Sequence, residues 1–230
     1  MHHHLALLTL ALLGLAAAPG VQAGNLVVNG SFESGFDGWT RGGGNLRNPA
    51  SVITYNSSAT YPTGAYGEPV RPSDAPTDSP DAAGARAAYF VDDLAVNERL
   101  SQIVFLEAGS YQIGFSAYLP RNGFNNRGDA TFSGSIAGMM LANFAASTAP
   151  AQSWQAFSGT TMVATPGNYA IEFVFNTNLA PSKDVVIDQV YIIPISTAAA
   201  VAEPASLALF AAGLLGLGVA SRRRRRPSEA

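Results

Sequence analysis

The sequence predicts an all-β body made of two packed sheets. No long window shows a helical period, and short apolar runs are instead separated by Gly, Pro, Asn and Ser. Within residues 111–119 every second position is apolar, and a similar alternation with bulky residues returns at 169–176. A period of two with bulky residues on one face is typical of strands that lie on a core.

Nine short segments are predicted as strands, and that number favours two sheets packed face to face. Turn signals rich in Gly, Asn and Pro separate the later segments. The predicted strands are 25–29, 50–55, 87–91, 101–106, 110–119, 129–136, 153–163, 168–176 and 185–193.

Two stretches lack this pattern. Residues 41–50 are rich in glycine, and residues 59–86 carry many Pro, Asp, Ala and Gly residues. The second stretch is predicted to be a long surface loop or a locally disordered insertion. Long loops often carry binding residues, but a plain spacer is the favoured interpretation.

The composition excludes several kinds of site. Between residues 24 and 200 the chain has 14 acidic and 8 basic residues, so a nucleic-acid partner is not expected. There is no cysteine, and all three histidines lie at positions 2–4. The rest of the chain therefore has no disulfide, no Ser-His-Asp or Cys-His catalytic set and none of the usual zinc sites.

The N-terminus has the order of a secretory signal peptide. Residues 5–18 are almost entirely apolar, Pro19 and Gly20 end that block, and small residues lead to a cleavage point after Ala23. Residues 1–23 are therefore predicted to be removed by signal peptidase once the secretion machinery has exported the chain. The segment before the apolar block has no Lys or Arg, and a purification tag is the alternative source of its histidines.

The C-terminus combines an apolar span with a basic cluster. Residues 204–221 would measure about 27 Å as a helix, close to the ~30 Å hydrocarbon core of a bilayer. A basic run beside a transmembrane helix places that end in the cytoplasm, which leaves the body outside. A buried core helix with a basic tail is the alternative. The run, residues 222–226, comprises Arg222, Arg223, Arg224, Arg225 and Arg226.

Residues 201–206 read Val-Ala-Glu-Pro-Ala-Ser at the start of this span. Glu203 and Pro204, with the span and the arginines, resemble the PEP-CTERM sorting signal, although Ala202 stands where that motif usually has Pro. The resemblance implies that residues 197–230 are a sorting tail cut by an exosortase, a membrane protease-transpeptidase of Gram-negative bacteria. It further implies an inner-membrane anchor before processing, a cell-surface or extracellular location afterwards, and a role near exopolysaccharide and biofilm.

The two ends of the body carry a second resemblance. Residues 25–39 contain N-G-S-F-E followed by G-W, and V-I-D-Q-V at 186–190 follows Trp154 and a G-N-Y turn. These segments resemble the opening and closing parts of carbohydrate-binding-module-like jelly rolls. The resemblance implies that residues 24–196 form a two-sheet jelly-roll β-sandwich with Trp39 and Trp154 packed in its core. Fold alone does not decide function.

The same resemblance implies a structural calcium ion joining the first and last strands. Glu33 matches the family's acidic residue after the first strand, and Asp188 matches the one in the closing strand. This hard cation prefers carboxylate and carbonyl oxygens, and it would tie the chain ends where no disulfide can. The alternative is that both carboxylates accept hydrogen bonds from loop amides.

A sugar platform is the second predicted site, because the C–H face of a sugar packs on an exposed aromatic ring. Tyr118 falls on the non-core face of its predicted strand, and Tyr61 and Tyr66 lie in the 59–86 stretch. For Tyr118, an ordinary surface tyrosine is the alternative.

A third candidate is an acid pair for glycoside hydrolysis at Asp92 and Asp93. Adjacent strand residues point to opposite faces, so a loop-ordering role is favoured for both. The sequence thus predicts an exported, non-catalytic β-sandwich protein of the extracellular matrix. Carbohydrate binding is one hypothesis for it, a structural or adhesive role without a glycan ligand is another, and a glycoside hydrolase is the third.

Overall fold

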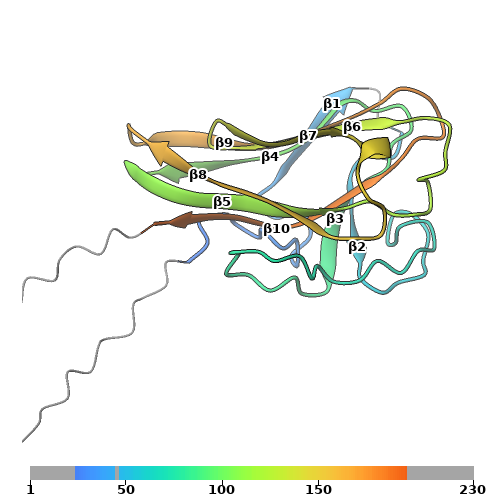
Figure 1. Cartoon of the computed structure of the whole chain (residues 1–230), viewed down its shortest axis with the longest axis horizontal. Helices are drawn as coiled ribbons and strands as arrows, with labels where there is room; N and C mark the ends of the chain where they lie inside the picture. Colours follow the sequence, from blue (N-terminus) through green and yellow to red (C-terminus); the bar gives the residue numbers. More distant parts are fainter. Residues whose placement is uncertain (1–23, 45–46, 196–230) are drawn as a thin grey trace, which may run out of the picture.

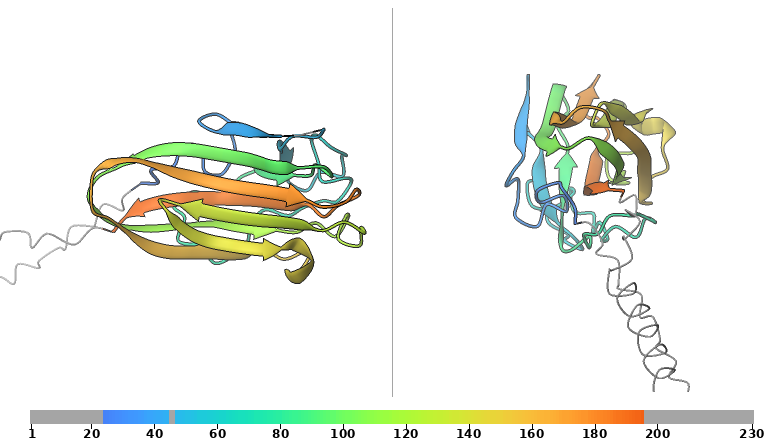
Figure 2. Two further views of the ribbon diagram at one scale, coloured as in Figure 1. Left: turned by 90° about the horizontal axis from the view of Figure 1, so that it is seen from above. Right: turned by 90° about the vertical axis from the view of Figure 1, so that its left-hand side faces the viewer.

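The computed structural model describes residues 24–44 and 47–195, which form two five-stranded antiparallel sheets packed face to face (Figure 1). Figure 2 shows the two layers from above and from one end. Sheet A has the order β1 (Thr40–Gly44), β4 (Val96–Leu106), β9 (Gly167–Thr177), β6 (Ala130–Ile136) and β7 (Met139–Ala145). Sheet B has the order β2 (Ser51–Thr54), β3 (Arg86–Phe90), β10 (Val185–Pro194), β5 (Gly109–Tyr118) and β8 (Gln155–Val163). The predicted all-β, two-sheet class is confirmed.

Every predicted strand except 25–29 overlaps an observed one, and two observed strands were not predicted. β1 consists largely of glycine and lies at the edge of sheet A, paired only with β4. β7 has no clean alternation, because its pairing with β6 shifts register at Gly134 and Ser135. A short 3₁₀ turn, η1 (Ala146–Thr148), follows it.

Residues 25–29 are not a strand, although they lie beside β10. The Leu26 N–H donates to the Ile192 carbonyl at 2.9 Å, as a ladder partner would. The side-chain amide of Asn25 bonds the adjacent backbone groups of β10. Its oxygen accepts from the Ile192 N–H at 3.0 Å, and its nitrogen donates to the Val190 carbonyl at 2.9 Å. A side chain has therefore replaced the backbone ladder, which the apolar pattern does not reveal.

Aromatic and branched apolar side chains fill the space between the sheets. Phe115 of β5 meets Phe173 of β9 edge-on, with ring centroids 4.9 Å apart, and Phe132 stacks on Phe173 at 6.0 Å. Trp39 lies in this core as expected, and its indole N–H donates to the Asn29 carbonyl at 3.1 Å.

A second apolar cluster lies on the outer face of sheet B, where residues 55–85 cover it; Figure 1 shows this segment beneath β3 and β10. Residues 59–85 contain no helix or named strand, as the predicted long surface loop requires, but the loop packs on sheet B and is not a disordered insertion. The segment packs through small side chains, and backbone bonds such as Asn56 N–H to the Val70 carbonyl at 2.7 Å hold it in place. The cluster comprises Ile53, Tyr55, Ala65, Val70, Ala75, Ala83, Ala87, Tyr89, Val91, Tyr118, Trp154 and Val186.

Three features predicted for targeting lie outside the described residues and stay predictions: the signal peptide at 1–23, the motif at 201–206 and the span at 204–221. Within 24–44 and 47–195 no helix is long and apolar enough to cross a membrane.

Candidate functional site

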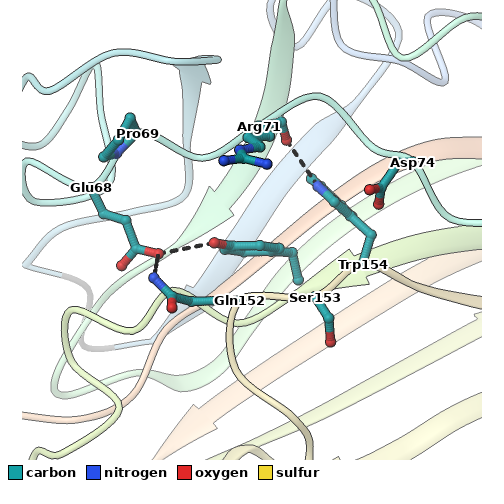
Figure 3. A pocket seen from close by; sticks show the side chains of 8 residues that line it. Glu68, Pro69, Arg71, Asp74, Gln152, Ser153 and Trp154 are labelled. Atoms are coloured by element: carbon teal, nitrogen blue, oxygen red, sulfur yellow. Dashed lines mark hydrogen bonds between the residues drawn. The ribbon is translucent and has the colours of Figure 1, made fainter.

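A cleft of about 480 Å³ opens on the outer face of sheet B, beside the covering segment. Figure 3 shows side chains from separate parts of the chain meeting there, among them the 68–74 stretch and the 152–154 turn that precedes β8. The residues that line the cleft are Glu68, Pro69, Arg71, Asp74, Tyr118, Gln152, Ser153 and Trp154.

Two aromatic rings form one wall of the cleft. The rings of Tyr118 and Trp154 lie with centroids 5.3 Å apart and planes tilted by 43°. Tyr55 supports the indole edge-on at 6.1 Å, and the indole N–H donates to the Arg71 carbonyl at 2.9 Å. These contacts fix the orientation of the Trp154 ring, so any ligand in the cleft meets a preformed surface.

Two expectations about these rings need correction. Tyr118 is on the non-core face of β5 as predicted, but residues 55–85 cover it and leave it only 7% exposed. Trp154 is buried as expected, yet it packs in the second cluster on the outer face and lines the cleft, instead of packing between the sheets.

Glu68 forms the polar end of the cleft and is held from three sides. One carboxylate oxygen accepts from the Tyr118 hydroxyl at 2.9 Å and from the Gln152 amide at 3.2 Å. The other accepts from the Asn122 N–H at 2.8 Å. Burial is the main cause that raises the pKa of Tyr118, and the hydrogen bond from its hydroxyl to Glu68 is the second. The Tyr118 hydroxyl therefore stays protonated. The arrangement presents fixed donors and acceptors next to the rings.

The rim of the cleft is exposed and polar. The side chains of Arg71, Asp74, Gln152 and Ser153 are all exposed there. A guanidinium, a carboxylate, an amide and a hydroxyl together offer both donors and acceptors to a ligand rich in hydroxyl groups. None of the four was predicted from sequence, because all lie in irregular segments without a pattern.

The tyrosines predicted to form a platform separate in the structure. Tyr118 lines the cleft, and Tyr66 lines a second, neighbouring pocket. Tyr61 lines neither pocket, since its ring is half-buried against the second cluster and its hydroxyl donates to the Pro49 carbonyl at 3.1 Å.

Asp92 and Asp93 both order loops. Asp92 is fully buried and accepts from the backbone N–H groups of Arg47, Asn48 and Leu94. Asp93 accepts from the Ser182 N–H at 2.6 Å. The two carboxylates serve different loops, so they do not form the facing pair that hydrolysis requires.

The two predicted calcium ligands each hold protein donors. One oxygen of the exposed Glu33 accepts from two backbone N–H groups around the start of β3, both at 2.8 Å. Asp188 is fully buried and accepts from the Tyr55 hydroxyl at 2.5 Å and the Gln189 N–H at 2.6 Å. In the described residues no three His, Cys, Asp or Glu side chains come together as a metal site. A calcium ion at Glu33 and Asp188 would therefore compete with these protein donors.

Calcium at Glu33 and Asp188 stays a prediction with a direct test. Burial, together with the nearby carboxylates of Glu33 and Asp81, raises the pKa of Asp188 to about 8. A cation there would offset that repulsion, so the calcium hypothesis predicts a lower melting temperature in EDTA than in millimolar calcium chloride. Glu33→Gln should abolish the difference. Equal melting temperatures in the two buffers would exclude the ion.

No family model matches the chain, and no curated protein sequence matches it. The similar solved structures include carbohydrate-binding modules. TmCBM61 in complex with β-1,4-galactotriose is 20% identical, with 74% of this chain and 99% of that chain covered and a TM-score of 0.44. The second family 16 carbohydrate-binding module is 15% identical, with coverages of 73% and 99% and a TM-score of 0.41.

The CBM22-1 xylan-binding domain of Paenibacillus barcinonensis Xyn10C is 13% identical, with 78% of this chain and 100% of that chain covered and a TM-score of 0.41. Similarities of this size assign no ligand to the chain. The functional argument therefore rests on the cleft itself.

Proposed function

We propose that this chain is a non-catalytic carbohydrate-binding protein and that the cleft on sheet B is its binding site. One observation carries the proposal: an oriented pair of aromatic rings, Tyr118 and Trp154, shares a cleft of about 480 Å³ with several fixed or exposed polar groups.

A saccharide ring has the chemistry that such a cleft matches. Its C–H face is apolar and packs on an aromatic ring, while its hydroxyls both donate and accept hydrogen bonds. In the cleft, the accessible part of Trp154, a residue that is 8% exposed, would supply the apolar contact, and the rim groups of Arg71, Asp74 and Gln152 would supply the hydrogen-bond partners. Glu68 is buried and accepts three bonds, so its carboxylate needs no rearrangement when a ligand arrives.

The location of the protein is part of the proposal and rests on the sequence. Export through the signal peptide, exosortase cleavage near Glu203 and Pro204, and release to the cell surface or beyond would bring the cleft to extracellular polysaccharide. The absence of cysteine does not conflict with this route, because a body of about 170 residues buries a core without disulfides.

The test is direct binding of neutral oligosaccharides to the full chain, purified in a detergent without a sugar headgroup. Isothermal titration with cello-, xylo-, manno-, β-1,4-galacto- and N-acetylchito-tetraose is expected to give at least one dissociation constant below about 1 mM. Absence of heat with every tetraose at millimolar concentration would contradict the proposal and favour a structural or adhesive matrix protein.

A glycoside hydrolase remains the second candidate, because two carboxylates, Glu68 and Asp74, line one cleft. Against it, both oxygens of Glu68 accept hydrogen bonds from protein donors, which leaves this residue poorly suited to deliver a proton. Chromatography of the same titration mixtures distinguishes the two functions, since a hydrolase would release shorter sugars.

A further inference from the structure

A second pocket of about 290 Å³ lies next to the cleft. It is bounded by the turn at 65–68, the turn at 121–126 and the segment that leads into β10. The polar and aromatic groups that line it and matter here are Tyr66, Asp93, Asn122, Asn126, Ser182 and Asp184.

Glu68 and its neighbours join the two pockets. One oxygen of its carboxylate accepts from Tyr118 and Gln152, which line the cleft, while the other accepts from the Asn122 N–H, which lines the second pocket. The Asn122 side chain in turn donates to the Tyr66 carbonyl at 3.0 Å. A single buried carboxylate therefore fixes the shared wall, and the two pockets keep a constant relation to each other.

Tyr66 stands at the tip of a tight turn at the mouth of the second pocket. The Glu68 N–H donates to the Ala65 carbonyl at 3.0 Å across this turn, and both central residues have positive φ, 47° at Tyr66 and 81° at Gly67. Such turns favour Asn or Gly, and a bulky residue in this conformation is an outlier. Tyr66 is 49% exposed. A costly residue at a turn that would accept Asn suggests that the ring itself is used.

The walls of the second pocket are polar and held by the protein. The Ser182 carbonyl accepts from the Asn126 side chain at 2.6 Å, and the Ser182 N–H donates to Asp93 at 2.6 Å. Asp184 is buried and accepts from the Tyr89 hydroxyl at 2.5 Å. An aromatic ring at the mouth of a cavity with carboxylate and amide groups repeats the chemistry of the cleft.

The charge of the combined surface restricts its ligands. Four carboxyl groups line the two pockets, and Arg71 is the only basic residue among the lining residues. Burial raises the pKa of Asp184 to about 8, so this group adds little negative charge at neutral pH. Lys183 is not among the lining residues, and its ammonium donates to the Asn126 and Gly128 carbonyls. In the described part of the chain none of these carboxylates forms an ion pair. The carboxylates are Glu68, Asp74, Asp93 and Asp184. Glycans that carry acid groups would meet repulsion here.

We propose that the two pockets are neighbouring saccharide subsites of one groove, which binds a segment of a polysaccharide without acid groups. The inference rests on the proposed function of the cleft. The Trp154 subsite holds one part of the polysaccharide, and the next part of the polysaccharide passes Glu68 to reach Tyr66. Affinity then depends on oligosaccharide length, and the two subsites contribute separately.

The experiment uses the full chain and a length series, from disaccharide to hexasaccharide, of the backbone that binds best. Affinity is expected to rise at least tenfold along the series. Tyr66→Asn removes the ring but suits the positive φ of the turn, so the fold is retained. This variant should bind the hexasaccharide about tenfold more weakly and bind the disaccharide as the wild type does. Tyr66→Phe, which keeps the ring, should remain within about twofold for both ligands.

The charge restriction is tested with oligogalacturonate of matched length, which should bind at least tenfold more weakly than the neutral hexasaccharide. A Tyr66→Asn variant with wild-type hexasaccharide affinity, or affinity that does not change with length, would overturn the second subsite and leave the cleft intact. Tighter binding of oligogalacturonate would overturn the assigned ligand class. Failure of every oligosaccharide to bind would instead overturn the proposed function, and this inference with it.

Discussion

Trp154→Ala is expected to weaken binding of the best tetraose about thirtyfold or more. Buried aromatic anchors at binding sites commonly contribute at least 2 kcal/mol, and this indole is both oriented by Arg71 and placed in the cleft. Titration calorimetry measures the loss directly. A folded Trp154→Ala protein with unchanged affinity would show that the sugar binds elsewhere.

Two controls separate lost binding from lost folding. Phe105→Ala removes the side chain of a residue that is 58% exposed on sheet A, whereas the cleft lies on sheet B, and it should leave the affinity unchanged. Gln152→Ala changes an exposed rim residue and should reduce the affinity severalfold with little change in the melting temperature. A melting curve of Trp154→Ala itself shows whether the second cluster survives the loss of the indole.

The protein is expected to become less stable as the pH rises from about 4 to about 8. Burial raises the pKa of Asp184 and of Asp188 to about 8 and that of Glu98 to about 7. In the unfolded chain such carboxyls titrate near pH 4, so across this window the folded state keeps protons that the unfolded state has released. The free energy of unfolding therefore falls with rising pH, and the stabilising contribution is complete only below about pH 4.

The predicted change is large enough for simple thermal melts. A difference of one proton across one pH unit is worth about 1.4 kcal/mol, so the melting temperature should drop by about 5 °C or more between pH 5 and pH 8. EDTA in both buffers removes any cation from Asp188. Asp188→Asn and Asp184→Asn should each flatten the dependence, whereas the exposed Asp37→Asn should not. A melting temperature that rises over this range would contradict the burial of these carboxyls.

Much of the fold could be predicted from the alternation of apolar and polar residues, because most strands have one face on the core. Residues 111–119 and 169–176 show the period of two, and they became β5 and β9. β1 was missed because glycine residues carry no alternation, and the ladder at 25–29 was replaced by the side chain of Asn25.

The packing of the covering segment on sheet B was not predicted, although the sequence contained a sign of it. Residues 185–193 are apolar at nearly every position, a pattern typical of a strand buried on both faces. β10 is buried in this way, with sheet A on one side and residues 55–85 on the other. The segment itself packs mainly through Val70 and the small side chains of Ala65, Ala75 and Ala83, which are too widely spaced to give a hydrophobic period.

The candidate site was only partly accessible to prediction. Tyr118 and Tyr66 were selected because aromatic residues outside the core are unusual enough to be noticed. Glu68, Asp74 and Gln152 were not, because their role depends on a long-range contact between the covering segment and β5. Contacts of that kind are set by three-dimensional packing, and no local pattern encodes them.

The central claim, that the cleft beside the covering segment is the sugar site, is tested most directly by an NMR titration. The isotope-labelled full chain is titrated with the tetraose that binds best, and backbone amide shifts are followed. We predict that the largest shift changes fall at residues 68–74, at Tyr118 and at 152–154. Changes confined to the outer face of sheet A, around Ile103 and Phe105, would contradict the account.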